Sequence, residues 1–295
     1  MRILIIGTGY VGMNTGVVFS YIGHDVTCLD VNAEKIKLLQ AGIPPFYEPH
    51  LEEMLHLVGG KMKFTTSYAE ADIPSMDAVF IAVGTPSLPD GSANLEYVRQ
   101  AAESIAEHMD DHFLVVVNKS TVPIGSGNWV GSIIKDVYEK KIGTKINGQF
   151  AVVSNPEFLR QGAALQDSFY PDRLVIGSEN EQGIQRLTEL FDPILKQTFD
   201  APECLPRTKG LQEVPLLVCD LTSAEVIKYA ANSFLALKIS YINEIAHLAQ
   251  KVGADVTLIA RGIGLDSRIG PRFLNPGIGW GGSCFGKDTA ALVAT

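Results

Sequence analysis

One cysteine lies in the densest glycine run of the chain. Cys284 follows four glycines between Gly277 and Gly282, inside the segment 275–288. So many glycines cost conformational entropy on folding, which predicts positive φ angles or a close approach of the backbone to a ligand. Lys287 and Asp288 add a cation and a carboxylate, and a nearby cation favours the thiolate, the reactive form of cysteine. We interpret the segment as a nucleophile loop, against the alternative of a glycine-rich turn around an inert thiol.

A second glycine-rich turn follows the first apolar run of the chain. Residues 2–6 are apolar and β-branched, and Gly7-Thr-Gly-Tyr-Val-Gly12 comes directly after them. A helix-compatible stretch at 13–22 and a strand-like run at 24–30 complete the pattern of a dinucleotide-binding turn. Asp30 is then placed to bind a ribose 2′-hydroxyl and to repel a 2′-phosphate, which predicts NAD rather than NADP. The alternative is an ordinary turn between a strand and a helix.

Composition narrows the class of protein. The 295 residues are 46% hydrophobic and carry a net charge of -9, which disfavours nonspecific binding to nucleic acid. No apolar run approaches the roughly 20 residues of a membrane helix, and no secretory signal precedes the first strand, so we expect a cytoplasmic protein that does not bind membranes. The cysteines at 28, 204, 219 and 284 form no C-x-x-C pair, so neither a zinc site nor a disulfide framework is indicated.

Strand and helix patterns alternate through the first two hundred residues. Such alternation predicts an α/β fold: a Rossmann-like, doubly wound parallel sheet with right-handed crossovers. The expected strands are 61–65, 77–83, 113–118, 150–154 and 173–177, and the expected helices include 94–109, 127–140 and 181–195. Gly84-Thr-Pro86, Lys119-Ser-Thr121 and Asn155-Pro-Glu-Phe158 follow three of these strands, where such sheets bind ligands. Each could be an ordinary turn, but together they indicate a cleft.

The last third of the chain predicts a helical domain. A proline-rich connection at 202–215 and a short strand at 215–219 lead to one uninterrupted helix over 221–252, with a capping box at Thr222 and Glu225. We expect an NAD-binding domain over 1–205 and a helical domain over 206–295. The long helix is apolar on two sides, which predicts a domain core on one side and a second subunit on the other.

Two polar residues interrupt the apolar surface of this helix. Lys228 and Asn232 are four residues apart and therefore lie on one helical face. They could stabilise an oxygen that becomes negatively charged during a reaction. The alternative is a solvated helix face.

Taken together, these motifs resemble the UDP-glucose/GDP-mannose dehydrogenase family of nucleotide-sugar dehydrogenases. The resemblance runs over essentially the whole chain and includes Lys119-Ser-Thr-Val-Pro123, Asn155-Pro-Glu-Phe-Leu-Arg160 and Gly281-Gly-Ser-Cys-Phe285. It implies a four-electron oxidation of a sugar C6 alcohol to a carboxylate by two NAD in succession, with UDP-glucose as the expected substrate. Cys284 would form first a thiohemiacetal and then a thioester.

The resemblance also implies roles for individual residues. Lys228 and Asn232 would stabilise an alkoxide or oxyanion, Asp288 with Thr121 would hold a water molecule, and Glu157 would act as the base in thioester hydrolysis. The implied cofactor contacts are Gly7, Gly9, Tyr10, Val11, Gly12, Asp30, Lys35, Thr85, Thr121, Glu157 and Lys287. The implied substrate contacts are Glu157, Phe158, Leu159, Arg160, Gln161, Lys228, Asn232, Phe273, Leu274, Asn275, Pro276, Gly277 and Gly281. No metal is expected.

The chain departs from the family pattern in three respects. Gly286 replaces a common proline, Gln161 replaces a common glutamate, and the third, nucleotide-gripping domain of the family is not seen before the chain stops at Thr295. We therefore expect a truncated chain that does not turn over by itself. Two alternatives remain open: a two-electron dehydrogenase of small hydroxy acids, and a dimeric NAD-binding fragment without catalysis.

Overall fold

The computed structural model describes residues 1–86, 88–89, 92–146, 148–281 and 283–293. The chain divides into two compact units. The first unit contains Met1–Pro86 and Asn94–Glu225, and the second contains Val226–Thr295 with the short stretch Ser87–Ala93. The domain limits expected from the sequence, 1–205 and 206–295, stay a prediction, since compactness is no test of independent folding.

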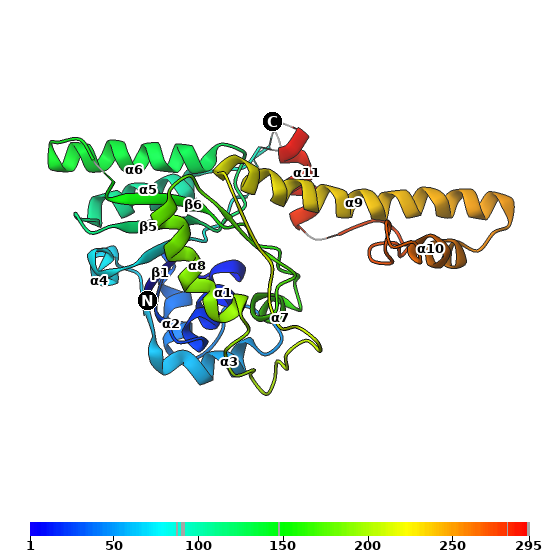
Figure 1. The fold of residues 1–295 in the computed structure, drawn as a ribbon, viewed down its shortest axis with the longest axis horizontal. Coiled ribbons are helices and arrows are strands. Elements are labelled where there is room, and N and C mark those ends of the chain that lie inside the picture. The colour runs from blue at the N-terminus through cyan, green and yellow to red at the C-terminus, as the bar shows by residue number, and fades with distance from the viewer. Residues whose placement is uncertain (87, 90–91, 147, 282, 294–295) are drawn as a thin grey trace. The chain divides into compact units, whose positions relative to one another are not determined.

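An eight-stranded sheet forms the centre of the first unit, with the strand order β3-β2-β1-β4-β5-β6-β7-β8 (Figure 1). The strands are β1 (Arg2–Ile6), β2 (Asp25–Leu29), β3 (Met62–Thr65), β4 (Ala78–Ile81), β5 (Leu114–Asn118), β6 (Phe150–Ser154), β7 (Leu174–Gly177) and β8 (Leu216–Cys219). The strands from β3 to β6 in this order pair in parallel, and the order reverses its direction beside β1. The chain therefore has the Rossmann-like, doubly wound arrangement that the alternation of elements predicts.

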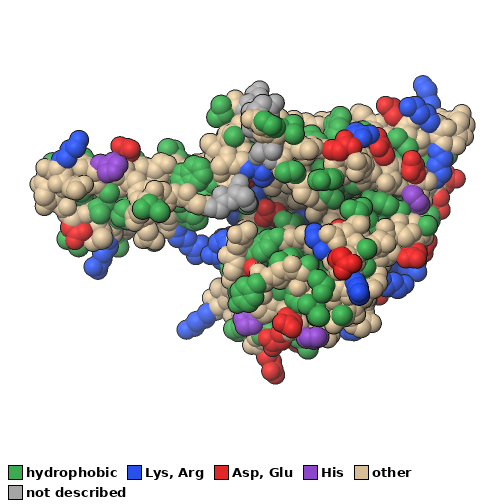
Figure 2. Space-filling model, turned by 180° about the vertical axis from the view of Figure 1, so that it is seen from behind, with side chains coloured by type: hydrophobic (Ala, Val, Ile, Leu, Met, Phe, Trp, Pro, Cys, Tyr) green, Lys and Arg blue, Asp and Glu red, His purple; other side chains and the backbone are tan. Residues whose placement is uncertain are grey.

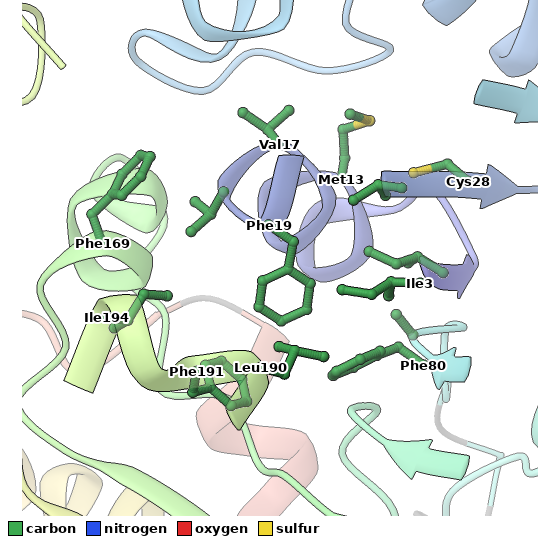
Figure 3. Close-up of a cluster of buried hydrophobic side chains, with 14 of the residues drawn as sticks. Ile3, Met13, Val17, Phe19, Cys28, Phe80, Phe169, Leu190, Phe191 and Ile194 are labelled. Carbon is green, nitrogen blue, oxygen red and sulfur yellow. The ribbon is translucent and has the colours of Figure 1, made fainter. Parts of the chain in front are cut away.

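Helices cover both faces of this sheet. Its helices are α1 (Tyr10–Tyr21), α2 (Ala33–Gln40), α3 (Leu51–Val58), α4 (Tyr68–Ala71), α5 (Glu96–His108), α6 (Ser126–Ile142), α7 (Ala164–Phe169) and α8 (Glu181–Leu195), with 3-10 turns η1 (Gly59–Lys61) and η2 (Ile73–Ser75). Successive strand residues point to opposite faces, so Ile3 and Leu4 enter different cores. One core packs against α1, α3 and α8, and the other against α5 and α6. Figure 3 shows the first core, where Phe19 of α1 lies between Phe80 and Phe191.

The directions of two strands differ from the prediction. The sequence predicts a parallel sheet throughout, but β7 pairs antiparallel with β6, through Ser154 and Gly177, and β8 then runs parallel to β7. The sheet is therefore mixed. An apolar run of four or five residues reads the same in either direction, so its orientation depends on the route of the preceding connection and has no local signal.

The start of the long helix is also capped differently from the prediction. Instead of a Thr222–Glu225 box, the carboxylate of Asp220 accepts from the Ser223 amide at 2.7 Å. Glu225 accepts from the amides of Gly125 at 2.6 Å and Gly127 at 2.7 Å. Gly125 is the N-cap of α6 and has no side chain for this purpose, so Glu225 caps a different helix.

The second unit is helical, as predicted. Helix α9 (Leu221–Val252) has the expected bounds and begins in the first unit, while α10 (Val256–Gly264) and α11 (Ser283–Val293) follow it. Lys238 donates to the Ile269 carbonyl at 3.0 Å, and the Gly277 amide donates to Asn243 at 2.9 Å, so the chain after α10 lies alongside α9. Figure 2 shows hydrophobic side chains on the surface of this unit. No helix in the described ranges is long and apolar enough to span a bilayer.

Candidate active site

Close backbone contacts, within the turn and with Ala82, restrict the first glycine turn. Gly7 has φ +101°, and a Cβ there would lie 2.6 Å from the Ala82 carbonyl oxygen. A Cβ on Gly12 would lie 1.9 Å from the carbonyl oxygen of Gly7. Gly9, by contrast, has open space beside it and is the N-cap of α1, without a capping side chain. The first amides of α1 are thus directed to a site where an anionic group fits. Val11 lies half-buried in the same turn.

Asp30 closes one side of this turn. Its Oδ2 accepts from the amide of Thr8 at 2.8 Å and the hydroxyl of Thr8 at 2.7 Å, and its Oδ1 accepts from the Asn32 amide at 3.0 Å. The ammonium of Lys35 lies 3.8 Å from Oδ2. Burial raises the pKa of Asp30, but these hydrogen bonds and the Lys35 charge outweigh burial and hold the pKa below its usual value. A carboxylate offers about four lone-pair positions, so it retains capacity for a ribose hydroxyl.

The segments after β4, β5 and β6 are connected by hydrogen bonds. The Thr85 hydroxyl donates to the Thr121 carbonyl at 2.8 Å, and Ser120 donates to the Val83 carbonyl at 2.7 Å. Lys119 donates to the Asn155 side-chain oxygen at 2.7 Å in a buried pair. The structure therefore brings together the three strand ends that the sequence singles out. Thr85 and Thr121 are neighbours in it.

The segment expected to bind substrate, 157–161, has an internal framework. Glu157 is buried, and its carboxylate accepts from the Leu159 amide at 2.7 Å. The Phe158 ring stacks on the guanidinium of Arg173, with 3.7 Å between the guanidinium carbon and the ring centroid. Arg160 is bound by Asp167 through its amide at 2.9 Å and its guanidinium at 2.6 and 3.0 Å. Gln161, which departs from the family pattern, is exposed.

No sequence motif points to one buried residue that contacts both the glycine turn and the segment after 157–161. Glu48 is 5% exposed and accepts from the hydroxyl of Tyr10 at 2.7 Å and the amides of Gly162 at 3.0 Å and Ala164 at 2.8 Å. These partners lie 38, 114 and 116 residues away along the chain. Sequence reasoning missed Glu48 because no pattern near it reports contacts at such separations.

The second unit gathers a separate set of predicted residues around Asp288. This carboxylate is 1% exposed; it accepts from Asn232 at 2.6 Å and from the Lys287 ammonium at 2.8 Å. Lys228 is also buried and lies one helical turn before Asn232 on α9. The solvated-face alternative for Lys228 and Asn232 is therefore wrong, because both side chains are buried. Lys287 pairs with Asp288, so its charge is shared with a carboxylate and is not reserved for the thiol.

Cys284 lies on the first turn of α11, so the prediction that it lies in a loop is wrong, and it is exposed there. The alternative of a buried, inert thiol is therefore wrong. Cys284 and Asp288 are four residues apart on this helix and lie on the same face. The amides of a helix N-terminus favour negative charge, which is the charge of a reacting thiolate. Gly282 of the same motif lies outside the described residues.

Aromatic side chains before and after Cys284 contact one another. Phe273 has φ +64°, and its ring lies 6.3 Å from that of Phe285, which also contacts Trp280 at 6.2 Å. At Gly286 a Cβ would make only ordinary contact with Trp280, so this position excludes no small side chain on steric grounds. Of the other predicted substrate contacts, Leu274 is buried, Pro276 is half-buried, and Asn275, Gly277 and Gly281 are exposed.

The predicted site residues therefore form two clusters, one in each unit. Thr121 and Glu157 belong to the first unit, and Cys284 and Asp288 to the second. The expected approach of Cys284 to the nicotinamide, and of Asp288 to Thr121, stays a prediction.

A possible metal-ligand group lies outside both clusters. The ligand atoms of His50, Glu53 and Cys204 lie within 4.8 Å of one another, although the cysteine spacing in the sequence indicates no zinc site. His50 and Glu53 are both exposed, and their 3.4 Å contact is a surface contact between residues three apart on the chain.

Comparison with known proteins matches each unit to a domain of one protein family. Residues 1–195 match the NAD binding domain of the UDP-glucose/GDP-mannose dehydrogenase family, and residues 222–295 match its central domain. The UDP-glucose 6-dehydrogenase YwqF of Bacillus subtilis is 46% identical over 99% of this chain and 61% of its own length.

Two solved structures support the same placement. A UDP-glucose dehydrogenase from Pyrobaculum islandicum has a TM-score of 0.86 at 40% identity, over 99% of this chain and 63% of that one. A GDP-mannose dehydrogenase from Pseudomonas aeruginosa has a TM-score of 0.78 at 32% identity, over 100% of this chain and 64% of that one. The chain thus spans about three fifths of the length of the curated relatives it matches. This chain therefore belongs to the UDP-glucose/GDP-mannose dehydrogenase family and carries that family's NAD-binding domain.

Proposed function

We propose that this chain supplies the NAD-binding and central parts of an enzyme that oxidises the C6 alcohol of a nucleotide sugar to a carboxylate. The observation that carries this proposal is the exposed thiol of Cys284, one helical turn before the buried Asp288 on α11. A thiol that only filled a core would not be exposed at a helix N-terminus. The family's NAD-binding domain in the same chain supplies the partner chemistry.

The thiol is needed for the second oxidation. An aldehyde does not release its remaining carbon-bound hydrogen as hydride until a nucleophile has added to the carbonyl carbon. NAD, when bound, accepts a hydride with its two electrons. Oxidation of the alcohol gives up one hydride and one proton and leaves an aldehyde. The sulfur of Cys284 adds to the carbonyl carbon while the oxygen takes a proton, and the resulting thiohemiacetal can lose a second hydride and proton. Water then displaces the sulfur from the thioester, which gives the carboxylate and restores the thiol.

The remaining residues would stabilise the charges that develop in these steps or position the reacting water. Lys228 and Asn232 would stabilise the alkoxide or oxyanion, and their burial supports this role because donors act most strongly away from water. Asp288 and Thr121 would hold the water molecule. Glu157 would be the base in thioester hydrolysis, from a buried position next to the Leu159 amide. Segments 157–161 and 273–277, with Gly281, would contact the sugar nucleotide.

UDP-glucose is the proposed substrate. The relatives named UDP-glucose dehydrogenases match this chain at 46% and 40% identity, above the 32% of the GDP-mannose enzyme. We place the reaction in the cytoplasm, where NAD and nucleotide sugars are present. The competing two-electron oxidation of a hydroxy acid would need no thiol at all.

Replacement of the thiol tests the proposal. We expect Cys284→Ser, in the full-length gene product, to lower turnover of UDP-glucose by a factor of about 10³ or more while the affinity for NAD stays unchanged. The wild-type enzyme should form two NADH per sugar, measured by absorbance against the consumption of UDP-glucose. Cys219→Ser, in the half-buried β8 position, is the matched control and should retain activity. One NADH per sugar, or an active Cys284→Ser enzyme, would favour the two-electron reaction instead.

We also propose that the second unit pairs with another copy of the chain. The predicted apolar face of α9 remains exposed, with Phe234 at 60%, Tyr241 at 53% and Leu248 at 55%. The second predicted face, with Ile242 and Ala249, is buried. A second subunit would cover the exposed face and keep it from water.

A further inference from the structure

Glu48 connects two parts of the first unit that have separate predicted tasks. On one side its Oε2 receives the hydroxyl of Tyr10, the first residue of α1 in the cofactor turn. On the other side its two oxygens receive the amides of Gly162 and Ala164, which follow the predicted substrate segment and begin α7. The N-cap of α7, Ala163, has no side chain to do this.

Tyr10 and α7 also contact Arg160, in the predicted substrate segment 157–161. The Tyr10 hydroxyl also lies 3.1 Å from the carbonyl oxygen of Arg160, and Asp167 of α7 binds the amide and guanidinium of the same residue. The backbone of Arg160 is therefore contacted from two sides, by Tyr10 of the glycine turn at 7–12 and by Asp167 of α7.

A buried carboxylate is stable only while donors surround it, so the donors cannot separate without leaving it unpaired. Glu48 is 5% exposed and has three donors. Burial, and next the hydrogen bond to Glu48, raise the pKa of Tyr10, so its hydroxyl keeps the proton that it donates. A displacement of the Tyr10 side chain would thus remove a donor from Glu48, and a shift of Glu48 would disturb the amides of Gly162 and Ala164.

We propose that Glu48 is a positioning residue that couples the cofactor turn to the 157–164 segment, so that NAD bound at the turn orders the segment that receives the substrate. The inference rests on the proposed function only for the identity of that substrate. Reciprocity requires that whatever binds and orders 157–164 also strengthens the binding of NAD.

The test compares Glu48→Gln with Tyr10→Phe and the double variant. Glu48→Gln keeps the shape but directs an amide donor at other donors, and Tyr10→Phe removes one donor only. Hydrogen exchange of the amides in 157–164, with and without NAD, is the first measurement. It does not depend on sugar oxidation, so it separates this inference from the proposed function. We expect NAD to slow exchange in the wild-type protein and to have less than half that effect in either variant.

Kinetics supply the second measurement. We expect Glu48→Gln to raise both the Kd for NAD and the KM for the sugar nucleotide by about tenfold, with kcat within about twofold of wild type. The effects of the two substitutions should be non-additive, because they act on one contact. Glu53→Gln, an exposed acid of α3, is the control and should change neither constant.

Two results would overturn the inference. One is equal protection of 157–164 by NAD in the wild-type and variant proteins. The other is a loss of thermal stability with both binding constants unchanged, which is what a purely structural role predicts. Should Glu48→Gln not fold, Tyr10→Phe provides the same comparison, since it leaves the carboxylate with both amide donors.

Discussion

Asp30 keeps its negative charge in the folded protein through specific hydrogen bonds. Burial alone would raise its pKa, and the donors of Thr8 and Asn32, with Lys35, more than reverse this. The same contacts position it beside the cofactor turn. At the scale of single residues, the sequence singled out Asp30, Cys284 and the three glycines of the turn, because each belongs to a short motif whose chemistry depends on neighbours along the chain. Their roles stay predictions.

The lowered pKa of Asp30 predicts a dependence of stability on pH. The folded state binds this proton less tightly than the unfolded state, whose carboxyl titrates near about pH 4. The stabilisation is therefore present above that pH and is lost as the pH falls through the lower, folded value. We expect Asp30→Asn to be less stable than wild type at pH 7, and the difference to shrink as the pH falls from about 5 to 3.

Urea unfolding at a series of pH values measures this effect. Glu34→Gln, an exposed acid in the first turn of α2, is the control and should keep the wild-type slope. A difference between Asp30→Asn and wild type that stays constant from pH 7 to pH 3 would contradict the assignment.

At the scale of elements, the periodicity of apolar residues predicted the long helices correctly. The bounds of α8 and α9 agree with the predicted ranges, because helices of this length repeat their apolar pattern several times. The direction of β7 and the partners of Glu225 and Glu48 were not predictable in this way. Glu225 lies 100 residues from Gly125, and only the folded sheet brings them together. Local chemistry thus identified the capping residue but not the helix that it caps.

The capping of α6 by Glu225 predicts an asymmetry between two substitutions. Glu225→Ala leaves the amides of Gly125 and Gly127 without their acceptor in a buried place, so we expect it to cost about 1–3 kcal/mol of unfolding free energy. Thr222→Ala, at the exposed position of the predicted capping box, should cost less than about 0.5 kcal/mol. Urea unfolding of both variants checks this. An equal loss of unfolding free energy in the two variants would contradict this assignment and favour the predicted capping box of Thr222 and Glu225.

At the scale of the whole molecule, the described residues leave an apolar face of α9 exposed. Phe234, Leu237, Tyr241 and Leu248 follow helical spacing along it, and all of them are more than half exposed. The sequence predicted two apolar faces, and the structure distinguishes the covered face from the open one. A pattern along one chain does not contain that distinction, since both faces have the same period.

A second copy over this face predicts a concentration-dependent association. We expect analytical ultracentrifugation to show a dimer at micromolar concentration, and Tyr241→Glu to shift it to monomer because a charge would be buried in the interface. Glu244→Gln, an exposed polar position on the same helix, is the control. A wild-type protein that stays monomeric at these concentrations would contradict the proposed pairing.

The four thiols of the chain differ in how far a reagent can reach them. Cys28 is buried, Cys204 and Cys219 are half-buried, and Cys284 alone of the four is exposed. An alkylating reagent added in limiting amount would therefore modify the proposed nucleophile first, and the label incorporated would count reactive centres in a preparation. The same accessibility favours oxidation by air at this sulfur, so a preparation kept without reductant should lose the Cys284 thiol before the other three.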